Sequence, residues 1–529
     1  MELLSPVRSC HTLVSCPRLG QSTSFAHWRA KEIALFAVLF VYPGRNQRIG
    51  GFKTQALKKY VPIVMIIDIF IHMSTIMTRL SFNSRSVCNK TIENQLHSRF
   101  ECVFSNPHHP IGCKIRVVEN QIVTLEKQAY GGECIAHLAD GRAAFVPLGL
   151  PGEQVEIEIT ENKERYVRGR IVRTLTASPD RVVAPCAHFG ACGGCHYQHI
   201  TYAQQLEVKS EVALDQFRRI GKLCNIPFSG ITPSPKPFHY RNQVQFHPNE
   251  SGKLCYQSLD GTGLLPIETC LLPNEAIADL WPQLVLEPDS GLKRVSFRED
   301  SYQNPMLVFE GEDEVAPEMD FELPVSATYL NPDGEASNLA GEDFLVYEVL
   351  GKTLKVSPES FFQVNLPVAT EMVSHVLSHL PKDRFTHILE LYSGVGLFSP
   401  FLADRTDSLT AIEASPSSNY DFVDNLDAFD NVSLYEGSVE SILPGLLPEL
   451  KDVELVVLDP PRAGLHTRAL NALLTLLPQY ICYVSCDPAT LARDLQRLTK
   501  AGYILDDLHL FDMFPQTYHV ESVALLHAR

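Results

Sequence analysis

The sequence predicts an α/β protein in which a doubly wound, Rossmann-like carboxyl-terminal domain follows a small OB-like β-barrel and a mixed α+β central domain. From about residue 355 onward, apolar strands alternate with helical runs, as in a parallel sheet covered on both faces. Between residues 114 and 175, short segments alternate apolar and polar residues and are broken by Gly-Gly, Asp-Gly and Pro-Gly turns. This second pattern predicts a barrel of about five strands.

The composition is that of a globular protein with several domains, because 529 residues contain 45% hydrophobic and 20% charged residues. The net charge of −17 excludes a generally polycationic surface. Any nucleic-acid partner must therefore be held by local basic patches. Such a patch is found at Lys163, Arg165, Arg168, Arg170 and Arg173. We weigh two interpretations of it, a nucleic-acid face and a solvated edge strand.

Residues 1–112 do not follow this organisation. Their most apolar stretches are 33–42, which is too short to span a bilayer, and 60–77, which contains Asp68 and His72. A weak membrane anchor is one alternative, and an extension of uncertain order or a start codon assigned too early is the interpretation we favour. We expect a cytoplasmic protein without a secretory signal or stable membrane association.

A cysteine cluster follows the predicted barrel. Cys186, Cys192 and Cys195 have the pattern C-x5-C-x2-C, and three thiolates on one tight loop are typical ligands of a soft metal or an iron–sulfur cluster. The fourth ligand could be Cys224, Cys255 or Cys270, and we favour Cys270, which precedes a predicted helix. Zinc, or four buried free cysteines, are the alternatives.

A glycine turn joins an apolar strand to a helix within residues 387–403. Gly394 and Gly396 would let a nucleotide-like cofactor approach the backbone, and Glu413, 17 residues after Gly396, ends the next strand. An acid at that place can accept hydrogen bonds from both ribose hydroxyls of an adenosine. Ser399 stands where a dinucleotide fingerprint has its third glycine, so the turn better suits S-adenosylmethionine, which has no pyrophosphate.

Two further motifs end strands of this domain. The segment 454–465 ends a strand with Asp459-Pro460-Pro461-Arg462, where prolines stiffen a loop at the edge of the sheet. A plain strand-terminating turn is the alternative. The segment 484–493 reads VSCDPATLAR and places Cys486 between a strand and a helix.

A thiol at a helix amino terminus is expected to favour the thiolate, which is the nucleophilic form. Pro488 suits the first helical turn. Cys482, inside the preceding strand, is interpreted as a core residue. A buried strand-end cysteine is the alternative for Cys486.

The segments SPESFFQVN, ELYSGVGLFS, DPPRAGL, SCDPATLARDL and HVESVALL resemble signatures of the RNA (uracil-5-)-methyltransferase family that uses S-adenosylmethionine. The resemblance runs from about residue 115 to 529. The barrel resembles the TRAM domain, an RNA-binding module, and the barrel with a cysteine cluster is similar to the branch acting on 23S ribosomal RNA. The resemblance implies a TRAM barrel at 113–176, a central domain with the cluster at 177–350, and a class I methyltransferase domain at 351–529.

The resemblance also implies roles for matched residues. A [4Fe-4S] cluster would be held by Cys186, Cys192, Cys195 and Cys270, and S-adenosylmethionine by Gln363, Tyr392, Glu413 and Asp459. Cys486 would be the nucleophile and Glu521 the base. Because Glu521 lies in an apolar run, we expect burial to raise its pKa. Ser393 and Ser438 depart from the family pattern.

The predicted function is therefore transfer of a methyl group from S-adenosylmethionine to carbon 5 of a uridine in 23S ribosomal RNA, through a covalent bond from Cys486 to carbon 6. The same chemistry on transfer RNA or on another ribosomal uridine is one alternative. A non-catalytic RNA-binding assembly factor, with the cluster as a structural element, is another. We expect a monomer.

Overall fold

The computed structural model describes residues 120–321 and 324–529. The predictions made for residues 1–112, including the apolar stretches 33–42 and 60–77, lie outside this part of the chain. Within the part described, no helix has the length and apolar character needed to cross a membrane.

The amino-terminal barrel is a six-stranded sheet, one strand more than the approximate number predicted, with the order β1-β5-β6-β4-β3-β2. Its side chains alternate inward and outward, and Val123, Ala136, Val146, Ile157 and Val167 form a closed apolar core. The additional strand is the two-residue β2, too short to leave a periodic pattern. The strands are β1 (Gln121–Thr124), β2 (Lys127–Gln128), β3 (Glu133–His137), β4 (Ala143–Pro147), β5 (Gln154–Asn162) and β6 (Tyr166–Thr176).

Three arginines of the basic patch lie on β6, which is an interior strand between β5 and β4 and not the edge strand considered above, whereas Lys163 and Arg165 precede this strand. Arg170 forms an ion pair with Glu158 at 2.5 Å and Arg173 with Glu156 at 3.1 Å, both across the β5–β6 pairing. Arg168 is paired with Glu133. These three cations are therefore matched by carboxylates of the barrel itself, which favours a solvated face over a dedicated phosphate track.

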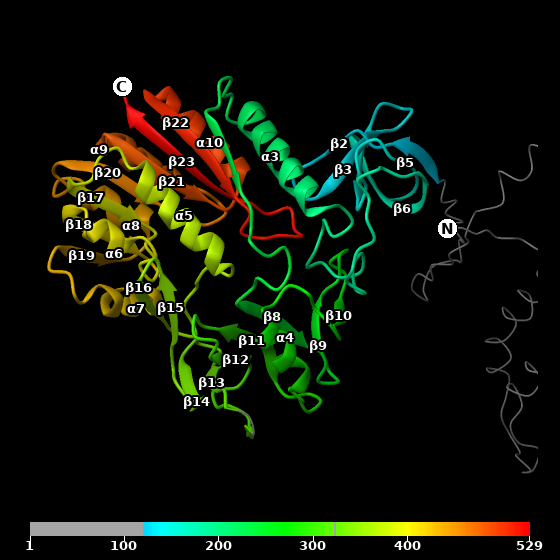
Figure 1. Ribbon diagram of the computed structural model, residues 1–529, viewed down its shortest axis with the longest axis horizontal. Coiled ribbons are helices and arrows are strands. Elements are labelled where there is room, and N and C mark those ends of the chain that lie inside the picture. Colours follow the sequence, from blue (N-terminus) through cyan, green and yellow to red (C-terminus); the bar gives the residue numbers. More distant parts are fainter. Residues whose placement is uncertain (1–119, 322–323) are drawn as a thin grey trace, which may run out of the picture. The chain divides into compact units, whose positions relative to one another are not determined.

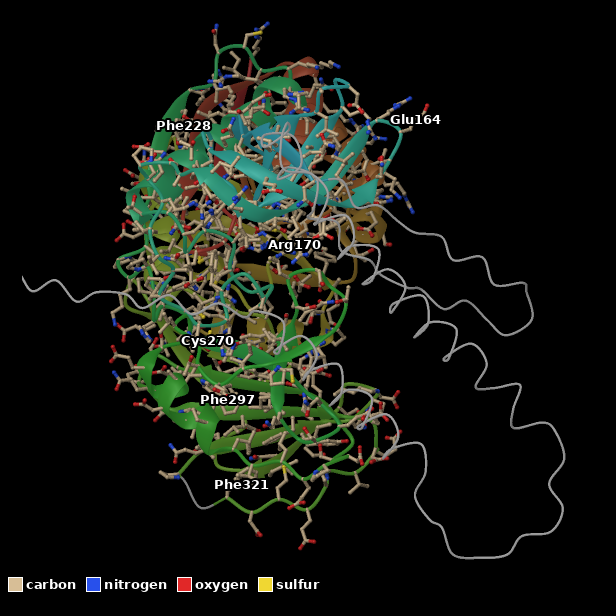
Figure 2. All side chains as sticks on the ribbon, turned by 90° about the vertical axis from the view of Figure 1, so that its right-hand side faces the viewer. Glu164, Arg170, Phe228, Cys270, Phe297 and Phe321 are labelled. Atoms are coloured by element: carbon tan, nitrogen blue, oxygen red, sulfur yellow. The ribbon has the colours of Figure 1, made fainter. Side chains whose placement is uncertain are left out.

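The central part of the chain forms a seven-stranded sheet with the order β10-β9-β8-β11-β12-β13-β14. Phe246, Phe297, Phe309 and Trp281 pack on it, and Figure 2 labels Phe297 in this green part of the ribbon. The elements are β8 (Gln243–Pro248), β9 (Leu254–Gln257), β10 (Leu264–Pro266), α4 (Glu275–Leu280), η1 (Trp281–Gln283), β11 (Leu292–Glu299), β12 (Pro305–Gly311), β13 (Ser326–Leu330) and β14 (Ala336–Ala340).

Two elements within residues 177–350 pack with the carboxyl-terminal domain instead of the central sheet. Strand β7 (Phe228–Thr232) pairs in parallel with β22 (Tyr503–Phe511), and helix α3 (Tyr202–Arg219) packs against α10 (Pro488–Lys500). Figure 1 shows α3 running beside this sheet. A hairpin of β15 (Leu345–Val349) and β16 (Lys352–Val356) then leads into the carboxyl-terminal domain.

The carboxyl-terminal domain is built on an eight-stranded sheet with the order β19-β18-β17-β20-β21-β23-β22-β7. All pairings are parallel except those of β23, which runs antiparallel to both neighbours. The remaining strands are β17 (Phe385–Leu391), β18 (Thr406–Glu413), β19 (Val432–Glu436), β20 (Val453–Leu458), β21 (Tyr480–Ser485) and β23 (Glu521–Ala528). The remaining helices are α5 (Leu366–His379), α6 (Ser399–Ala403), α7 (Pro416–Leu426), α8 (Val439–Leu446) and α9 (Thr467–Leu476).

The strand order places a topological switch beside β17. The chain adds β18 and β19 on one side of β17 and then returns to add β20 and β21 on the other (Figure 1). Crevices at such a switch, at the carboxyl ends of parallel strands, are where open α/β sheets bind ligands. The glycine turn, Glu413, Asp459 and Cys486 all follow or end these strands. The predicted α/β, Rossmann-like fold is confirmed.

Candidate active site

The antiparallel strand β23 brings Cys486 and Glu521 to the same edge of the sheet. Ser485, the last residue of β21, pairs with Ser522 of β23. Cys486 and Glu521 are the next residues outward on the two strands, so their main chains meet at the carboxyl end of β21. The negative charge of Glu521 raises the pKa of the Cys486 thiol, which agrees with this placement.

Asp487 caps the helix that follows Cys486. Its Oδ1 accepts hydrogen bonds from the backbone N–H groups of Ala489 at 2.9 Å and Thr490 at 2.8 Å. Pro488, which has no N–H to satisfy, occupies the first helical position. The cap and the proline together define where α10 begins, and this holds the preceding cysteine at the strand–helix junction.

The Cys486 thiol does not have the lowered pKa that its position at a helix amino terminus predicts. Burial, with the negative charges of Glu521 and Asp459, raises its pKa to about 12, although Arg462 acts in the opposite direction. The helix dipole falls off within a turn and has a modest effect. Desolvation and two nearby carboxylates outweigh it, so the thiol is protonated at neutral pH in the protein alone.

Two carboxyl groups beside the thiol have raised pKa values. Glu521 is only 5% exposed, and burial with the charge of Asp459 raises its pKa to about 8, as its apolar sequence context predicts. Burial raises the pKa of Asp459 to about 7. Both groups can therefore take up or release a proton near neutral pH, which is the requirement for acid–base work there.

The glycine turn after β17 is tied to Glu413 at the end of β18. The Gly394 N–H donates to Glu413 Oε2 at 2.9 Å, and the N–H groups of Ala414 and Ser415 donate to Oε1, each at 2.7 Å. Tyr392, at φ 61°, adopts the left-handed region, which is uncommon outside glycine and is concentrated at functional sites. The left-handed conformation of Tyr392 therefore marks this turn as a candidate ligand-binding position.

The turn leaves room and a free hydrogen-bonding group for a ligand. A Cβ atom built on Gly394 would meet no heavy atom within 4 Å. The Ser393 hydroxyl is buried without a hydrogen-bond partner among the described residues. The Asp459 N–H donates to the Leu391 carbonyl at 3.3 Å and thereby joins the loop after β20 to the same turn. These features fit a nucleoside-bearing cofactor such as S-adenosylmethionine.

Glu390 is a residue of this region that the sequence analysis did not select. It lies in β17 and is 2% exposed, its Oε2 accepts a hydrogen bond from Ser399 Oγ at 2.6 Å, and burial raises its pKa to about 8. The negative charges of Asp459 and Glu413 also raise the pKa of Glu390. The signal that could have revealed it is an acid inside an otherwise apolar strand directly before the glycine turn.

The remaining predicted cofactor residue, Gln363, lies on a neighbouring loop, and Ser438, which departs from the family pattern, is the N-cap residue of a helix. Gln363 is 7% exposed in the loop between β16 and α5, where its carbonyl accepts a hydrogen bond from Asn242 Nδ2 at 3.1 Å. Ser438, at the start of α8, bonds to Ser441 within its own helix at 2.8 Å. Ser438 is thus engaged locally, whereas Gln363 links the domain to the central part of the chain.

The four predicted cluster ligands are free thiols in one neighbourhood. Cys195 and Cys270 pack in the same small apolar cluster, and the charges of Cys186 and Cys192 both act on Cys270. Figure 2 labels Cys270. Within residues 120–321 and 324–529, no three His, Cys, Asp or Glu side chains form a group that could hold a metal ion as they stand. The four thiols are therefore neighbours, but their side chains are not arranged as the ligands of one metal site.

Comparison with known families and proteins agrees with this architecture. Residues 346–529 match the family described as tRNA (Uracil-5-)-methyltransferase, and residues 114–172 match the TRAM domain. An uncharacterized RNA methyltransferase of Aquifex aeolicus is 34% identical over 423 residues, which are 77% of this chain and 98% of that protein. One of Streptomyces avermitilis is 34% identical over 429 residues, with shares of 77% and 98%.

A solved structure is similar over the same extent. It is the Pyrococcus abyssi tRNA (uracil-54) carbon-5 methyltransferase in complex with S-adenosyl-L-homocysteine, with 25% identity and a TM-score of 0.59. The match covers 76% of this chain and all of that one. With a relative 34% identical over nearly its whole length, the chain belongs to the family of RNA (uracil-5-)-methyltransferases with a TRAM domain, and it is an RNA methyltransferase.

Proposed function

We propose that the protein transfers a methyl group from S-adenosylmethionine to carbon 5 of a uridine in 23S ribosomal RNA, through a covalent bond between Cys486 and carbon 6. The observation that carries the proposal is the meeting of Cys486 and Glu521 at the sheet edge that also holds the glycine turn. A nucleophile, a base and a cofactor cradle on one edge are what this chemistry needs.

S-adenosylmethionine would be held by Gln363, Tyr392, Glu413 and Asp459, and it supplies an electrophilic methyl group when bound. Glu413 ends the strand after the glycine turn, where a carboxylate can accept hydrogen bonds from ribose hydroxyls. The free Ser393 hydroxyl and the open space at Gly394 support the same placement.

The reaction begins at Cys486, because carbon 5 of uracil is too weak a nucleophile to take a methyl group unaided. The thiol proton passes to one of the carboxylates that act on it, and the thiolate adds to carbon 6. The electron pair of the ring double bond moves to carbon 5, which attacks the sulfonium methyl. Bound S-adenosylmethionine would supply that methyl group, and the neutral thioether would be the leaving group.

Glu521 then completes the reaction as the base. It removes the proton from carbon 5, the ring double bond forms again, and the bond from carbon 6 to Cys486 breaks to release the thiolate. A carboxyl with its pKa raised to about 8 is a stronger base than an exposed glutamate once it is ionised. The target base must leave its stack to reach this edge, so loops or remodelled RNA are the expected substrates.

Transfer RNA is the second candidate substrate. Its support is the printed description of the matching family and of the Pyrococcus abyssi enzyme, both of which name transfer RNA. The cysteine spacing C-x5-C-x2-C beside a TRAM barrel supports ribosomal RNA instead.

We also propose that Cys186, Cys192, Cys195 and Cys270 take up a [4Fe-4S] cluster after their side chains reorient. Support comes from their spacing, their free thiols and their shared neighbourhood. The loop is anchored next to β9, because the Gly193 N–H donates to the Gln257 carbonyl at 2.9 Å. We assign the cluster a role in structure or in RNA recognition, with no step of methyl transfer passing through it.

Replacing Cys486 with Ala should abolish turnover and the covalent complex with RNA containing 5-fluorouridine, because the proposed nucleophile that adds to carbon 6 is then absent. The complex is measured as a band that migrates slowly in denaturing gels. Cys224→Ala, at an exposed cysteine, is the matched control and should keep both properties. Methylation by the Cys486→Ala protein would refute the mechanism.

Methyl transfer should rise with pH towards about 8, because Glu521 must be ionised to accept the carbon-5 proton and its pKa is raised to about 8. Below that pH the carboxyl is protonated and cannot act as a base. Glu521→Gln should still form the covalent complex but release carbon-5 tritium at least about 100-fold more slowly. Unchanged tritium release would exclude Glu521 as the base.

Nucleosides from ribosomal and transfer RNA, mapped by mass spectrometry with and without the gene, should identify the substrate. We expect one 5-methyluridine to disappear from 23S ribosomal RNA while transfer RNA is unchanged. Loss confined to transfer RNA would assign the second candidate.

Protein purified without oxygen should contain about four iron and four acid-labile sulfide per chain, as a four-cysteine cluster requires. Cys192→Ser should lose most of both, and it should lose RNA affinity while it still binds S-adenosylmethionine. Cys224→Ser serves as the control. Zinc at one per chain, or no metal, would contradict the cluster.

A further inference from the structure

A tyrosine of the amino-terminal barrel reaches the residue next to the nucleophile. Tyr130 lies in the turn between β2 and β3, and its hydroxyl donates a hydrogen bond to Asp487 Oδ2 at 2.5 Å. The other oxygen of Asp487 caps helix α10, as described above. A single carboxylate thus connects the barrel, the helix start and the peptide that carries Cys486.

The barrel turn is shaped for this close approach. Gly131 and Gly132 follow Tyr130 with φ values of 102° and 84°. A Cβ on Gly132 would lie 3.2 Å from both His196 and Tyr518, closer than nearly all real Cβ contacts. The Tyr130 ring meets the Tyr518 ring edge-on at 5.9 Å. The glycines therefore allow the turn to pack against the segment that leads to Glu521.

Helix α3 holds the segment of residues 512–520, against which the barrel turn packs. Lys209 and Asp512 form a fully buried ion pair at 2.5 Å, and Lys209 Nζ also donates to the Phe514 carbonyl at 2.9 Å. The Gln205 side-chain amide donates to Gln516 Oε1 at 2.9 Å and accepts from the Gln516 backbone N–H at 3.0 Å.

The charges around Cys486 give the Tyr130 hydroxyl a chemical role. Asp459 and Arg462 from the loop after β20, Glu521 from β23 and Asp487 from its own loop all act on the thiol. Three of these four groups are carboxylates, which oppose the thiolate. Burial and the Asp487 charge raise the pKa of Tyr130, so its hydroxyl remains a donor that spreads the Asp487 charge.

We propose that Tyr130 is a positioning residue for the methyl-transfer reaction, which orients the Cys486 loop and favours thiolate formation through Asp487. The inference rests on the proposed role of Cys486. It assigns the barrel a second task beyond RNA binding, because the catalytic loop is complete only when the barrel turn is docked against Asp487 and Tyr518.

The test is alkylation of Cys486 by iodoacetamide in the full-length protein, without RNA or cofactor, measured by peptide mass spectrometry across pH. Tyr130→Phe removes only the hydroxyl and should slow alkylation at pH 8 by about tenfold and move its pH profile upward, as expected for a lost hydrogen bond to a charged group. The melting temperature should change little, because the ring still packs on Tyr518.

Tyr166→Phe is the matched control, since this tyrosine of β6 packs on Phe145 of β4 within the barrel. In an Asp487→Asn background, which keeps a capping oxygen without the charge, Tyr130→Phe should change alkylation less than about twofold. Alkylation that is unchanged or faster in Tyr130→Phe, or an equal effect in the Asp487→Asn background, would overturn the inference. Methylation by Cys486→Ala would instead refute the proposed function and leave the alkylation result standing.

Discussion

The site depends on one antiparallel strand in an otherwise parallel sheet. In parallel strands only the carboxyl ends reach the ligand-binding edge, so a residue at the start of a strand lies at the far side. Strand β23 reverses this rule, and its first residue, Glu521, reaches the edge where β21 delivers Cys486. The pairing of Ser485 with Ser522 sets the register, and a slip of one residue would turn the carboxylate to the other face.

Burial at that edge favours the proposed base and opposes the proposed nucleophile. It raises the pKa of Glu521 to about 8 and that of Asp459 to about 7, which suits proton transfer near neutrality. The same burial and charges raise the pKa of Cys486 to about 12, which opposes the nucleophile. Arg462 lowers the pKa of the thiol, and the Tyr130 hydroxyl donates to Asp487, one of the carboxylates that raise it, which is why the groups around the thiol matter as much as the thiol itself.

The domains of this family member are joined by side-chain contacts at the candidate active site and not only by linkers. The barrel contacts the loop after Cys486 through Tyr130, and α3 fixes the segment before Glu521 through the buried pair of Lys209 and Asp512. A buried ion pair adds little net stability but tolerates few alternative arrangements. The barrel and the methyltransferase domain therefore share a hydrogen bond. Because the chain belongs to a methyltransferase family, a role as a purely structural, non-catalytic RNA-binding factor is disfavoured.

The sequence by itself determined the α/β fold, the glycine turn, the helix start after Cys486 and the raised pKa of Glu521, because each follows from residues within a few positions of one another. It misjudged the thiol of Cys486, since the carboxylates that oppose it come from β20 and β23. It also overlooked that β6 arginines pair with β5 carboxylates. Only the tertiary structure decided the contact of Tyr130 with Asp487, 357 positions apart, because side chains that distant meet through packing alone.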